Sequence, residues 1–189
     1  MGLAFGDEMR VGLMGQVRKV WAPRGVKVRQ RVQMARQWRY LALAVDGARG
    51  RLSWCWIASM KEPAIAEAVR RWQADGVEAV VWDGAKGHRG ETVRRVGVAL
   101  VQQPPYAPEV QPAERVFEEL RRAIEGKVYP TIEAKVAAVE AELAQWAADP
   151  ARVRRLAGWA WIDAARADLP PGEAPGQDQV QPEQLELVA

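Results

Sequence analysis

Residues 79–114 read AVVWDGAKGHRGETVRRVGVALVQQPPYAPEVQPAE, and this stretch decides the fold. Two short apolar runs, residues 79–82 and 98–101, lie on either side of a polar segment that holds the chain's single histidine, His88. Both runs are too continuous for strands that have one face in water. They therefore predict parallel strands in the centre of a mixed sheet.

The residues before this stretch predict an antiparallel beginning to the sheet and one covering helix. Residues 3–5 form a short apolar run, and we expect a strand that ends at the acids after it. Residues 40–45 and 51–57 flank a turn sequence and predict a β-hairpin. Apolar residues at three- and four-residue spacing between Pro63 and Gly76 predict a helix that covers one face of the sheet.

The residues after the stretch predict further helices. Pro112 marks the start of an amphipathic helix and Gly126 its end. Another helix begins near Thr131 and has a narrow apolar seam, made of Ile132, Val136, Val139, Leu143 and Trp146. The seam fits packing on its own domain or on a partner helix. Helices and strands that alternate in this way imply an α/β sandwich.

Length and composition suit one domain. The chain has 189 residues, of which 49% are hydrophobic, and we place a single domain at residues 1–166. Residues 167–189 are acidic and rich in Pro and Gly, so we expect a disordered tail. We expect no membrane span and no signal peptide, and hence a cytoplasmic protein. A single cysteine excludes an intrachain disulfide and a cysteine-based zinc site.

Charge is divided unequally along the chain. Residues 1–166 hold 27 bases and 19 acids, a net charge of +8, whereas the tail holds 5 acids and no base. One run without acids, interleaved with aromatic residues, contains the bases Arg18, Lys19, Arg24, Lys27, Arg29, Arg31, Arg36 and Arg39. Such a run suits the phosphate backbone of a nucleic acid, and it also fits a solvated, Arg-rich face.

Three acids are expected where side chains project from the edge of the sheet. Asp7 and Asp83 follow predicted strands, and Glu114 lies in the first turn of a predicted helix, at the margin of its apolar face. Carboxylates gathered there repel one another unless cations lie between them, and oxygen ligands suit Mg²⁺ or Mn²⁺. We therefore expect a site for two such ions, of the kind that serves phosphoryl transfer.

Two other acids compete with Asp7 for the place of third ligand. Asp46 precedes Gly47 in the predicted hairpin and has a local role as a turn former. Glu8 follows Asp7 directly, so on an extended strand its side chain points to the opposite face of the sheet. We rank Asp7 first.

His88 lies five residues after Asp83 and has two interpretations. In the first it contacts the scissile phosphate or the leaving group of a phosphoryl transfer. In the second it is a hydrogen-bonded loop or helix-cap residue. Lys86 and Arg89, which flank it, add local capacity to bind phosphate.

Several of these segments resemble a known family. They are Asp7-Glu8, residues 21–25 (WAPRG), Asp83 with His88, and residues 104–109 (PPYAPE) followed by Pro112-Ala113-Glu114. Together they are similar to the catalytic domain of mariner-related bacterial insertion-sequence transposases, which belong to the DDE superfamily. The similarity runs in order from about Asp7 to Ile124.

The resemblance implies a fold, a site and a reaction. It implies a ribonuclease H-like fold in which Asp7, Asp83 and Glu114 are the metal-binding triad. It implies that water activated by metal cuts DNA at the end of a mobile element, and that the freed 3′-hydroxyl then attacks target DNA. It also implies a homodimer that works on paired ends. Full-length relatives carry a helix-turn-helix region that recognises element ends, so this chain is interpreted either as one half of a split transposase, with that region encoded separately, or as a truncated copy.

The chain departs from the family pattern in two places. Gly84 follows the second Asp, where the family commonly has Asn, and only 30 residues separate Asp83 from Glu114, a few fewer than is usual. We also note no helix-turn-helix before Asp7. Two alternatives therefore stay open: a catalytically decayed or truncated DNA-binding remnant of a transposase, and a stand-alone ribonuclease H-like nuclease.

Overall fold

A computed structural model describes residues 2–15, 19–105 and 107–167 of the chain. Five strands form one mixed sheet in the order β3-β2-β1-β4-β5. The strands are β1 (Leu3–Gly12), β2 (Trp38–Asp46), β3 (Arg51–Ile57), β4 (Ala79–Trp82) and β5 (Ala99–Gln102). The first three are antiparallel neighbours, and β4 and β5 run parallel to β1, as predicted.

The central strand is β1, and it is longer than the sequence predicts. It pairs with β2 as far as Gly12, opposite Trp38, and it does not end at the acids after Phe5. Asp7 therefore lies within a strand and not at its end. The prediction was wrong because β2 continues the hydrogen-bonding ladder past the acids, and that partner lies far away in the sequence.

The two apolar runs form parallel strands, but neither is the centre of the sheet. β4 lies next to β1, and β5 is the edge strand with only partly buried residues. Residues 98–101 were predicted to form a central strand, and this was wrong, because β5 lies at the edge of the sheet. Its run is apolar because one side is covered by β4 and the adjoining helices, although its other edge stays open.

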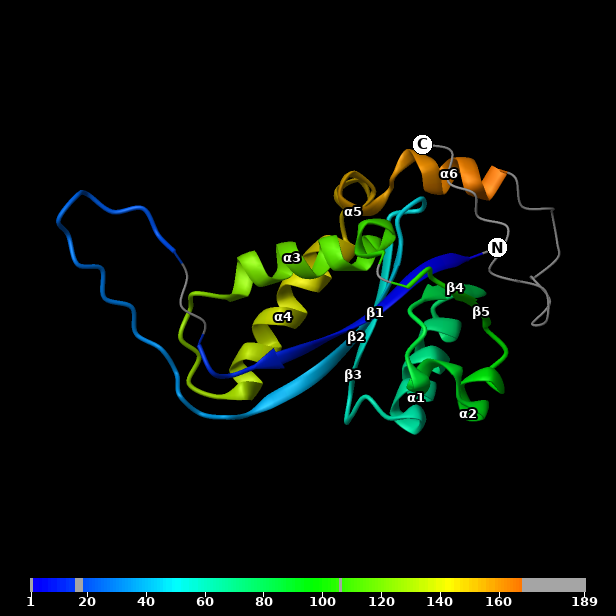
Figure 1. The fold of residues 1–189 in the computed structure, drawn as a ribbon, viewed down its shortest axis with the longest axis horizontal. Helices are drawn as coiled ribbons and strands as arrows, with labels where there is room; N and C mark the ends of the chain where they lie inside the picture. Colours follow the sequence, from blue (N-terminus) through cyan, green and yellow to red (C-terminus); the bar gives the residue numbers. More distant parts are fainter. Residues whose placement is uncertain (1, 16–18, 106, 168–189) are drawn as a thin grey trace.

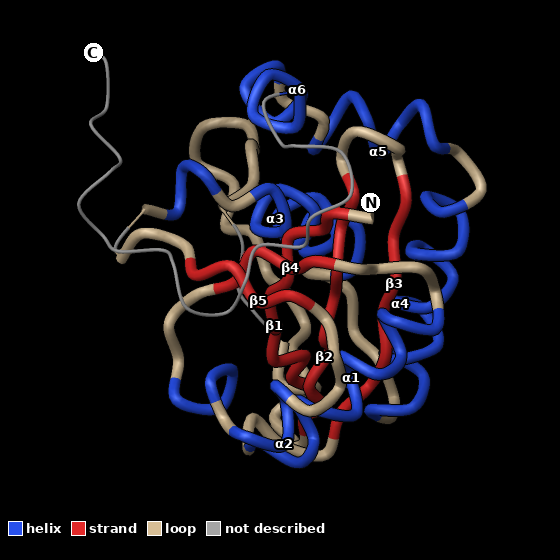
Figure 2. Tube along the Cα trace, turned by 90° about the vertical axis from the view of Figure 1, so that its right-hand side faces the viewer, coloured by secondary structure: helices blue, strands red, loops and turns tan. Residues whose placement is uncertain are grey.

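Helices cover both faces of the sheet (Figures 1 and 2). They are α1 (Glu62–Ala74), α2 (Glu91–Arg94), α3 (Pro112–Ile124), α4 (Ile132–Ala147), α5 (Pro150–Ala157) and α6 (Ala160–Ala167), with short 3-10 turns η1 (Lys86–Arg89) and η2 (Pro108–Val110). Apolar residues of α1 and α2 pack on one face, and those of α3 to α6 pack on the other. None of the helices in the described part is long and apolar enough to cross a membrane.

The seam of α4 packs on its own domain. Ile132, Val139, Leu143 and Trp146 are buried, and the last three belong to the core beneath the sheet. Val136 is partly buried. The choice between own-domain packing and a partner helix is thereby settled in favour of the first. The expected disordered tail lies outside the described residues, apart from Ala167, which ends α6.

A long connection joins β1 to β2, and we call residues 13–37 the arm. Its base continues the hairpin, because Leu13 N donates to Gln37 O at 2.8 Å and Gly15 N to Gln33 O at 2.9 Å. The turn predicted at residues 21–25 is present, with Val26 N donating to Pro23 O. Figure 1 shows residues 19–37 of the arm extending away from the body of the molecule, and most of their side chains are exposed.

Truncating the centre of the α4 seam should cost the most stability. Leu143→Ala removes a fully buried side chain and leaves a cavity, so we expect the free energy of unfolding to fall by about 2–5 kcal/mol. Gln145→Ala, on the exposed side of the same helix, should change it by less than about 0.5 kcal/mol. Urea unfolding followed by circular dichroism measures both, and equal losses would contradict this packing.

Candidate active site

Asp7, Asp83 and Glu114 line one cavity of about 440 Å³. Asp7 comes from the middle of β1, Asp83 directly follows β4, and Glu114 lies in the first turn of α3. The other lining residues are Gly84, Gln102, Gln103, Pro104, Pro105, Ala107 and Gln111. The structure thus brings together the three acids that the sequence singled out.

Strand register explains why the two aspartates meet. β1 and β4 pair from Leu3 with Ala79 to Phe5 with Val81. Two further residues along each strand bring Asp7 and Asp83 level with one another, at the point where β4 has ended. Asp7 lies on the same face of β1 as Phe5, which is the face that α3 covers. The cavity therefore lies where β1 is no longer paired with β4.

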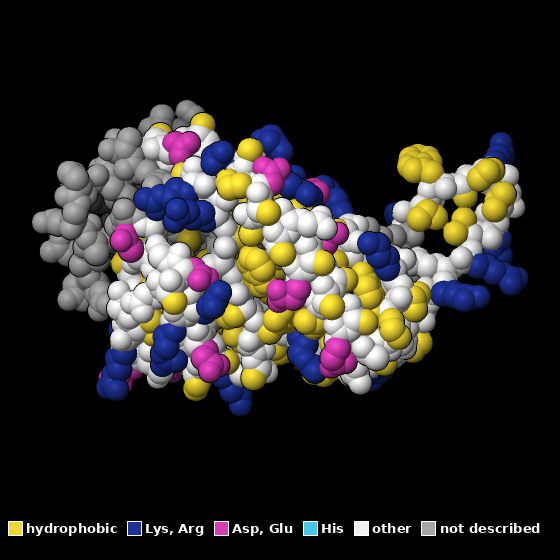
Figure 3. All heavy atoms as spheres, turned by 180° about the vertical axis from the view of Figure 1, so that it is seen from behind, with side chains coloured by type: hydrophobic (Ala, Val, Ile, Leu, Met, Phe, Trp, Pro, Cys, Tyr) yellow, Lys and Arg dark blue, Asp and Glu magenta, His cyan; other side chains and the backbone are white. Residues whose placement is uncertain are grey.

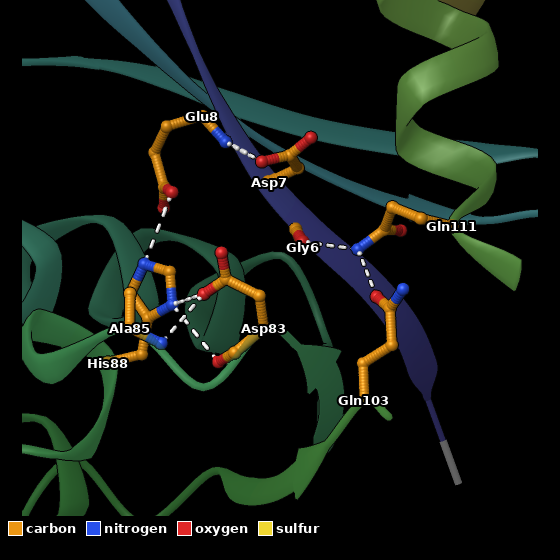
Figure 4. A network of polar contacts seen from close by, with 8 residues as sticks. All are labelled: Gly6, Asp7, Glu8, Asp83, Ala85, His88, Gln103 and Gln111. Carbon is orange, nitrogen blue, oxygen red and sulfur yellow. Dashed lines mark hydrogen bonds and ion pairs between the residues drawn. The ribbon is translucent and has the colours of Figure 1, made fainter. Parts of the chain in front are cut away.

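Two buried glutamines hold the start of α3 against β1. Gln111 Nε2 donates to Gly6 O at 3.0 Å and to Gln103 Oε1 at 3.1 Å (Figure 4). Gln111 Oε1 also accepts from Ala113 N at the helix N-terminus. Glu114 follows in the same turn, so these bonds fix its backbone beside Asp7. Gln103 and Gln111 were not predicted as site residues. The only signal was a glutamine directly before the proline that begins a helix.

Asp7 is an acid in surroundings that disfavour its charge. Burial raises the pKa of Asp7 to about 7, and the negative charges of Glu8, Glu114 and Asp83 act in the same direction. The backbone N–H of Glu8, at 2.7 Å, opposes them by donating to the carboxylate. A divalent cation in the cavity would favour the ionised form, because it screens the acids from one another.

The donor set fits a hard cation. All three acids offer carboxylate oxygens, which are the ligands of Mg²⁺ and Mn²⁺. Among the described residues, no three Asp, Glu, His or Cys side chains lie close enough to hold a metal ion as they stand. Glu114 is exposed, so its side chain has room to turn toward the aspartates.

A glutamine side chain occupies the space beside Gly84. A Cβ atom on Gly84 would lie 2.9 Å from Nε2 of Gln102, which is closer than such atoms approach. Gln102 also lines the cavity. A side chain at position 84 would therefore have to displace Gln102, and the polar group at this point of the cavity is the amide of Gln102.

His88 is buried behind the cavity and does not line it. Its Nε2 lies 3.2 Å from Glu8 Oε2, and its Nδ1 lies 2.6 Å from Asp83 Oδ1. Burial acts to lower the pKa of His88, but the hydrogen bond to Glu8 and the charges of both acids outweigh burial and raise it. Both ring nitrogens thus face carboxylates, as the hydrogen-bonded interpretation expects.

The remaining candidates lie elsewhere. Asp46 accepts from Arg49 N at 3.0 Å within the β2–β3 turn, so it has the local role expected of a turn former. Lys86 and Arg89 are exposed on η1, close to Asp83 in the chain. The bases of the arm within the described residues are all exposed, and they are Lys19, Arg24, Lys27, Arg29, Arg31 and Arg36; Arg39, the last base of the run, is exposed on β2. Arg18 lies outside the described residues.

Comparisons with known proteins identify the family of the chain and its fold. A family model for DDE superfamily endonucleases matches residues 2–134. The solved catalytic domain of Mos1 mariner transposase matches with a TM-score of 0.55 at 14% identity, over 82% of this chain and 75% of that one. The likeness confirms the expected ribonuclease H-like fold. A search of curated proteins found no match.

Larger assemblies of the same transposase also match. The mariner Mos1 paired end complex with Mg matches with a TM-score of 0.63 at 16% identity, over 88% of this chain and 55% of that one. The Mos1 strand transfer complex matches with a TM-score of 0.62 at 16% identity, over 82% and 50%. The chain therefore spans about half the length of those transposase chains.

Binding of Mn²⁺ should stabilise the folded protein through Asp7. A ligand that binds only the native state stabilises it by about 2.7 kcal/mol at one hundred times its Kd, so we expect Tm to rise with MnCl₂ in the wild type. The rise in Tm should be much smaller in Asp7→Asn. It should be as large as in the wild type in Asp163→Asn, because Asp163 is an exposed acid on α6, away from the cavity. Differential scanning fluorimetry measures all three, and an equal rise in Asp7→Asn would contradict the role of Asp7.

Proposed function

The chain belongs to the DDE superfamily of endonucleases, and from that premise we propose that it is the catalytic part of a transposase. Its substrate would be DNA at the ends of a mobile element, which it cuts and joins to target DNA. The observation that carries the proposal is the meeting of Asp7, Asp83 and Glu114 around one cavity. A mariner-related element of the bacterial insertion-sequence type is the source that the motifs favour.

The three acids suit a phosphoryl transfer. Two Mg²⁺ or Mn²⁺ ions held by these carboxylates would activate the attacking oxygen and stabilise the leaving oxygen. Asp7 provides a rigid carboxylate ligand, because it is held within β1 and accepts a hydrogen bond from the backbone N–H of Glu8. The glutamines at the start of α3 hold the backbone of Glu114, whose N–H donates to Gln111 O at 3.2 Å, and its side chain is left to turn toward the cations. No protein nucleophile is required, so the protein's role is to position the cations and DNA.

The arm and η1 supply the proposed DNA contacts. The exposed bases of the arm would bind phosphates along the duplex, and Lys86 and Arg89 would bind phosphates next to the cavity. Arg18 belongs to the same proposed set. Figure 3 shows basic and apolar side chains together on the projecting arm, as expected of a surface that touches more than a single partner.

A second copy of the chain is the other proposed partner. Trp21, Val20, Val26 and Met34 are exposed large apolar side chains on the arm, and such side chains gain stability when another surface covers them. The matched transposase structures include a paired-end complex with a transposon end and a strand transfer complex. A homodimer with a separately encoded helix-turn-helix half would give this chain the same kind of assembly.

Removing the charge of Asp83 should abolish cleavage. We expect the wild type to nick supercoiled plasmid DNA that carries candidate terminal repeats, with Mg²⁺ or Mn²⁺ present. Asp83→Asn should be slower by more than about 100-fold, because the site loses electrostatic stabilisation that acts in the transition state. Asp163→Asn serves as the matched control and should cut at the wild-type rate. Agarose gel electrophoresis of the nicked product gives the rates.

Two outcomes would replace the proposal. If the wild type and Asp83→Asn are equally inert while both bind DNA, the chain is a binding remnant that has lost catalysis. If the wild type cuts the RNA strand of an RNA–DNA hybrid and leaves duplex DNA intact, it is a nuclease of the same fold. Either result would remove the transposase assignment.

Neutralising the arm should weaken DNA binding in a salt-dependent way. Lys27→Gln with Arg29→Gln removes two exposed bases, so we expect the slope of log K against log salt to become shallower by about 2. Arg70→Gln with Arg121→Gln, two exposed helix bases, is the matched control and should leave the slope unchanged. Fluorescence anisotropy at several salt concentrations measures the slopes, and equal slopes in both pairs would contradict a role for the arm.

A further inference from the structure

Glu8 is a buried acid that the proposed reaction does not use. It lies on β1 next to Asp7 but on the opposite face, where its side chain is only 2% exposed. Among the described residues its Oε1 is buried without a hydrogen-bond partner. A carboxylate in such a place costs stability unless it is paired. In the described part of the chain, Glu8 Oε2 forms an ion pair with His88 Nε2 at 3.2 Å.

The ring of His88 is held on three sides. It stacks on Trp82 with ring centres 3.9 Å apart and an angle of 18° between the planes. Its Nε2 lies 3.2 Å from Glu8 Oε2, and its Nδ1 lies 2.6 Å from Asp83 Oδ1. Trp82 is itself packed against Trp72 of α1. These contacts fix the orientation of the imidazole, and the stacking partner Trp82 is itself fixed by its packing against Trp72.

This orientation restrains Asp83, which would otherwise be free to rotate. Asp83 is 62% exposed, and it lies in the loop after β4. Asp83 Oδ1 accepts a hydrogen bond from Ala85 N at 3.0 Å, and the same oxygen lies 2.6 Å from His88 Nδ1. Figure 4 shows the other carboxylate oxygen pointing away from His88. One oxygen is thus occupied, and the second is left for the cavity.

We propose that Glu8 and His88 are positioning residues: Glu8 orients the ring of His88, and His88 holds Asp83 so that its second oxygen faces the cavity with Asp7 and Glu114. The proposal rests on the proposed function, because it assigns these residues to the same cation-binding site. Glu8 acts from behind the sheet and touches neither cation nor DNA. The acid next to Asp7 therefore serves the site through another residue.

A purely structural role makes a different prediction. If Glu8 only stabilised the fold, Glu8→Leu would change stability and leave cation binding alone. The positioning role requires a hydrogen-bond acceptor for the ring of His88 at position 8. Glu8→Leu lacks this acceptor and should lower the affinity for Mn²⁺, whereas Glu8→Gln keeps it and should retain the affinity. An apolar side chain of similar size suits the buried surroundings of Glu8, and Glu8→Leu is therefore expected to fold.

Isothermal titration calorimetry with MnCl₂ separates these roles. We expect Glu8→Leu and His88→Ala to bind Mn²⁺ about 10-fold or more weakly than the wild type, since partners behind metal ligands typically contribute 10–100-fold. Glu8→Gln should bind within about 3-fold of the wild type on the same reasoning. Ser53→Ala is the control: it removes a hydrogen bond of another buried side chain, from Ser53 Oγ to the exposed Asp75 at 2.6 Å, away from the cavity. It should bind as the wild type does.

The single histidine allows a direct spectroscopic test, which also covers the case in which His88→Ala does not fold. In protein labelled with ¹⁵N-histidine, only His88 gives ring signals. We expect Mg²⁺ to shift the Nδ1 signal of the wild type and to leave it in place in Asp83→Asn. A ring signal that is the same in the wild type and in Asp83→Asn would overturn the proposed contact.

The outcomes separate this inference from the proposed function. If the protein does not cut DNA but its Mn²⁺ affinity still depends on Glu8 and His88, the transposase assignment fails and the positioning role stands. If the wild type cuts DNA while Glu8→Leu and His88→Ala bind Mn²⁺ and cut DNA as it does, the positioning role is overturned. Tm values measured on every variant exclude unfolding as the cause.

Discussion

The short parallel pairing of β1 with β4 is the constraint on which the site depends. β4 ends at Trp82, whereas β1 continues along β2 to Gly12. β1 therefore has a segment with a neighbour on only one side, and Asp7 lies at the beginning of that segment, level with Asp83. A longer β4 would cover this place with hydrogen bonds, and the cavity would be closed.

The same strand geometry brings several carboxylates close together, and their mutual repulsion has to be offset. Burial and neighbouring acids raise the pKa of Asp7 to about 7, so the metal-free site disfavours its ionised form. The two sides of β1 deal with this differently. On the α3 side, Asp7 faces a cavity suited to cations. On the α1 side, Glu8 is paired with His88, which lies against Asp83.

Local signals were enough to predict much of this arrangement. Pro63 and Pro112 marked helix starts, and the turn around Asp46 marked the hairpin. The long β1 was not predictable, because its ladder partner is distant in the sequence. The bonds of Gln111 to Gly6 and of His88 to Glu8 span 105 and 80 residues, so no spacing in the sequence announces them. Long-range packing decides which polar residues support a site.

The central claim is that Asp7, Asp83 and Glu114 form one cation-binding site. Anomalous diffraction at the manganese edge, from crystals soaked in MnCl₂, tests it most directly. We expect anomalous peaks in the cavity between these three carboxylates, with Asp83 bound through the oxygen that His88 leaves free. Manganese bound elsewhere on the chain, with none in this cavity, would contradict it.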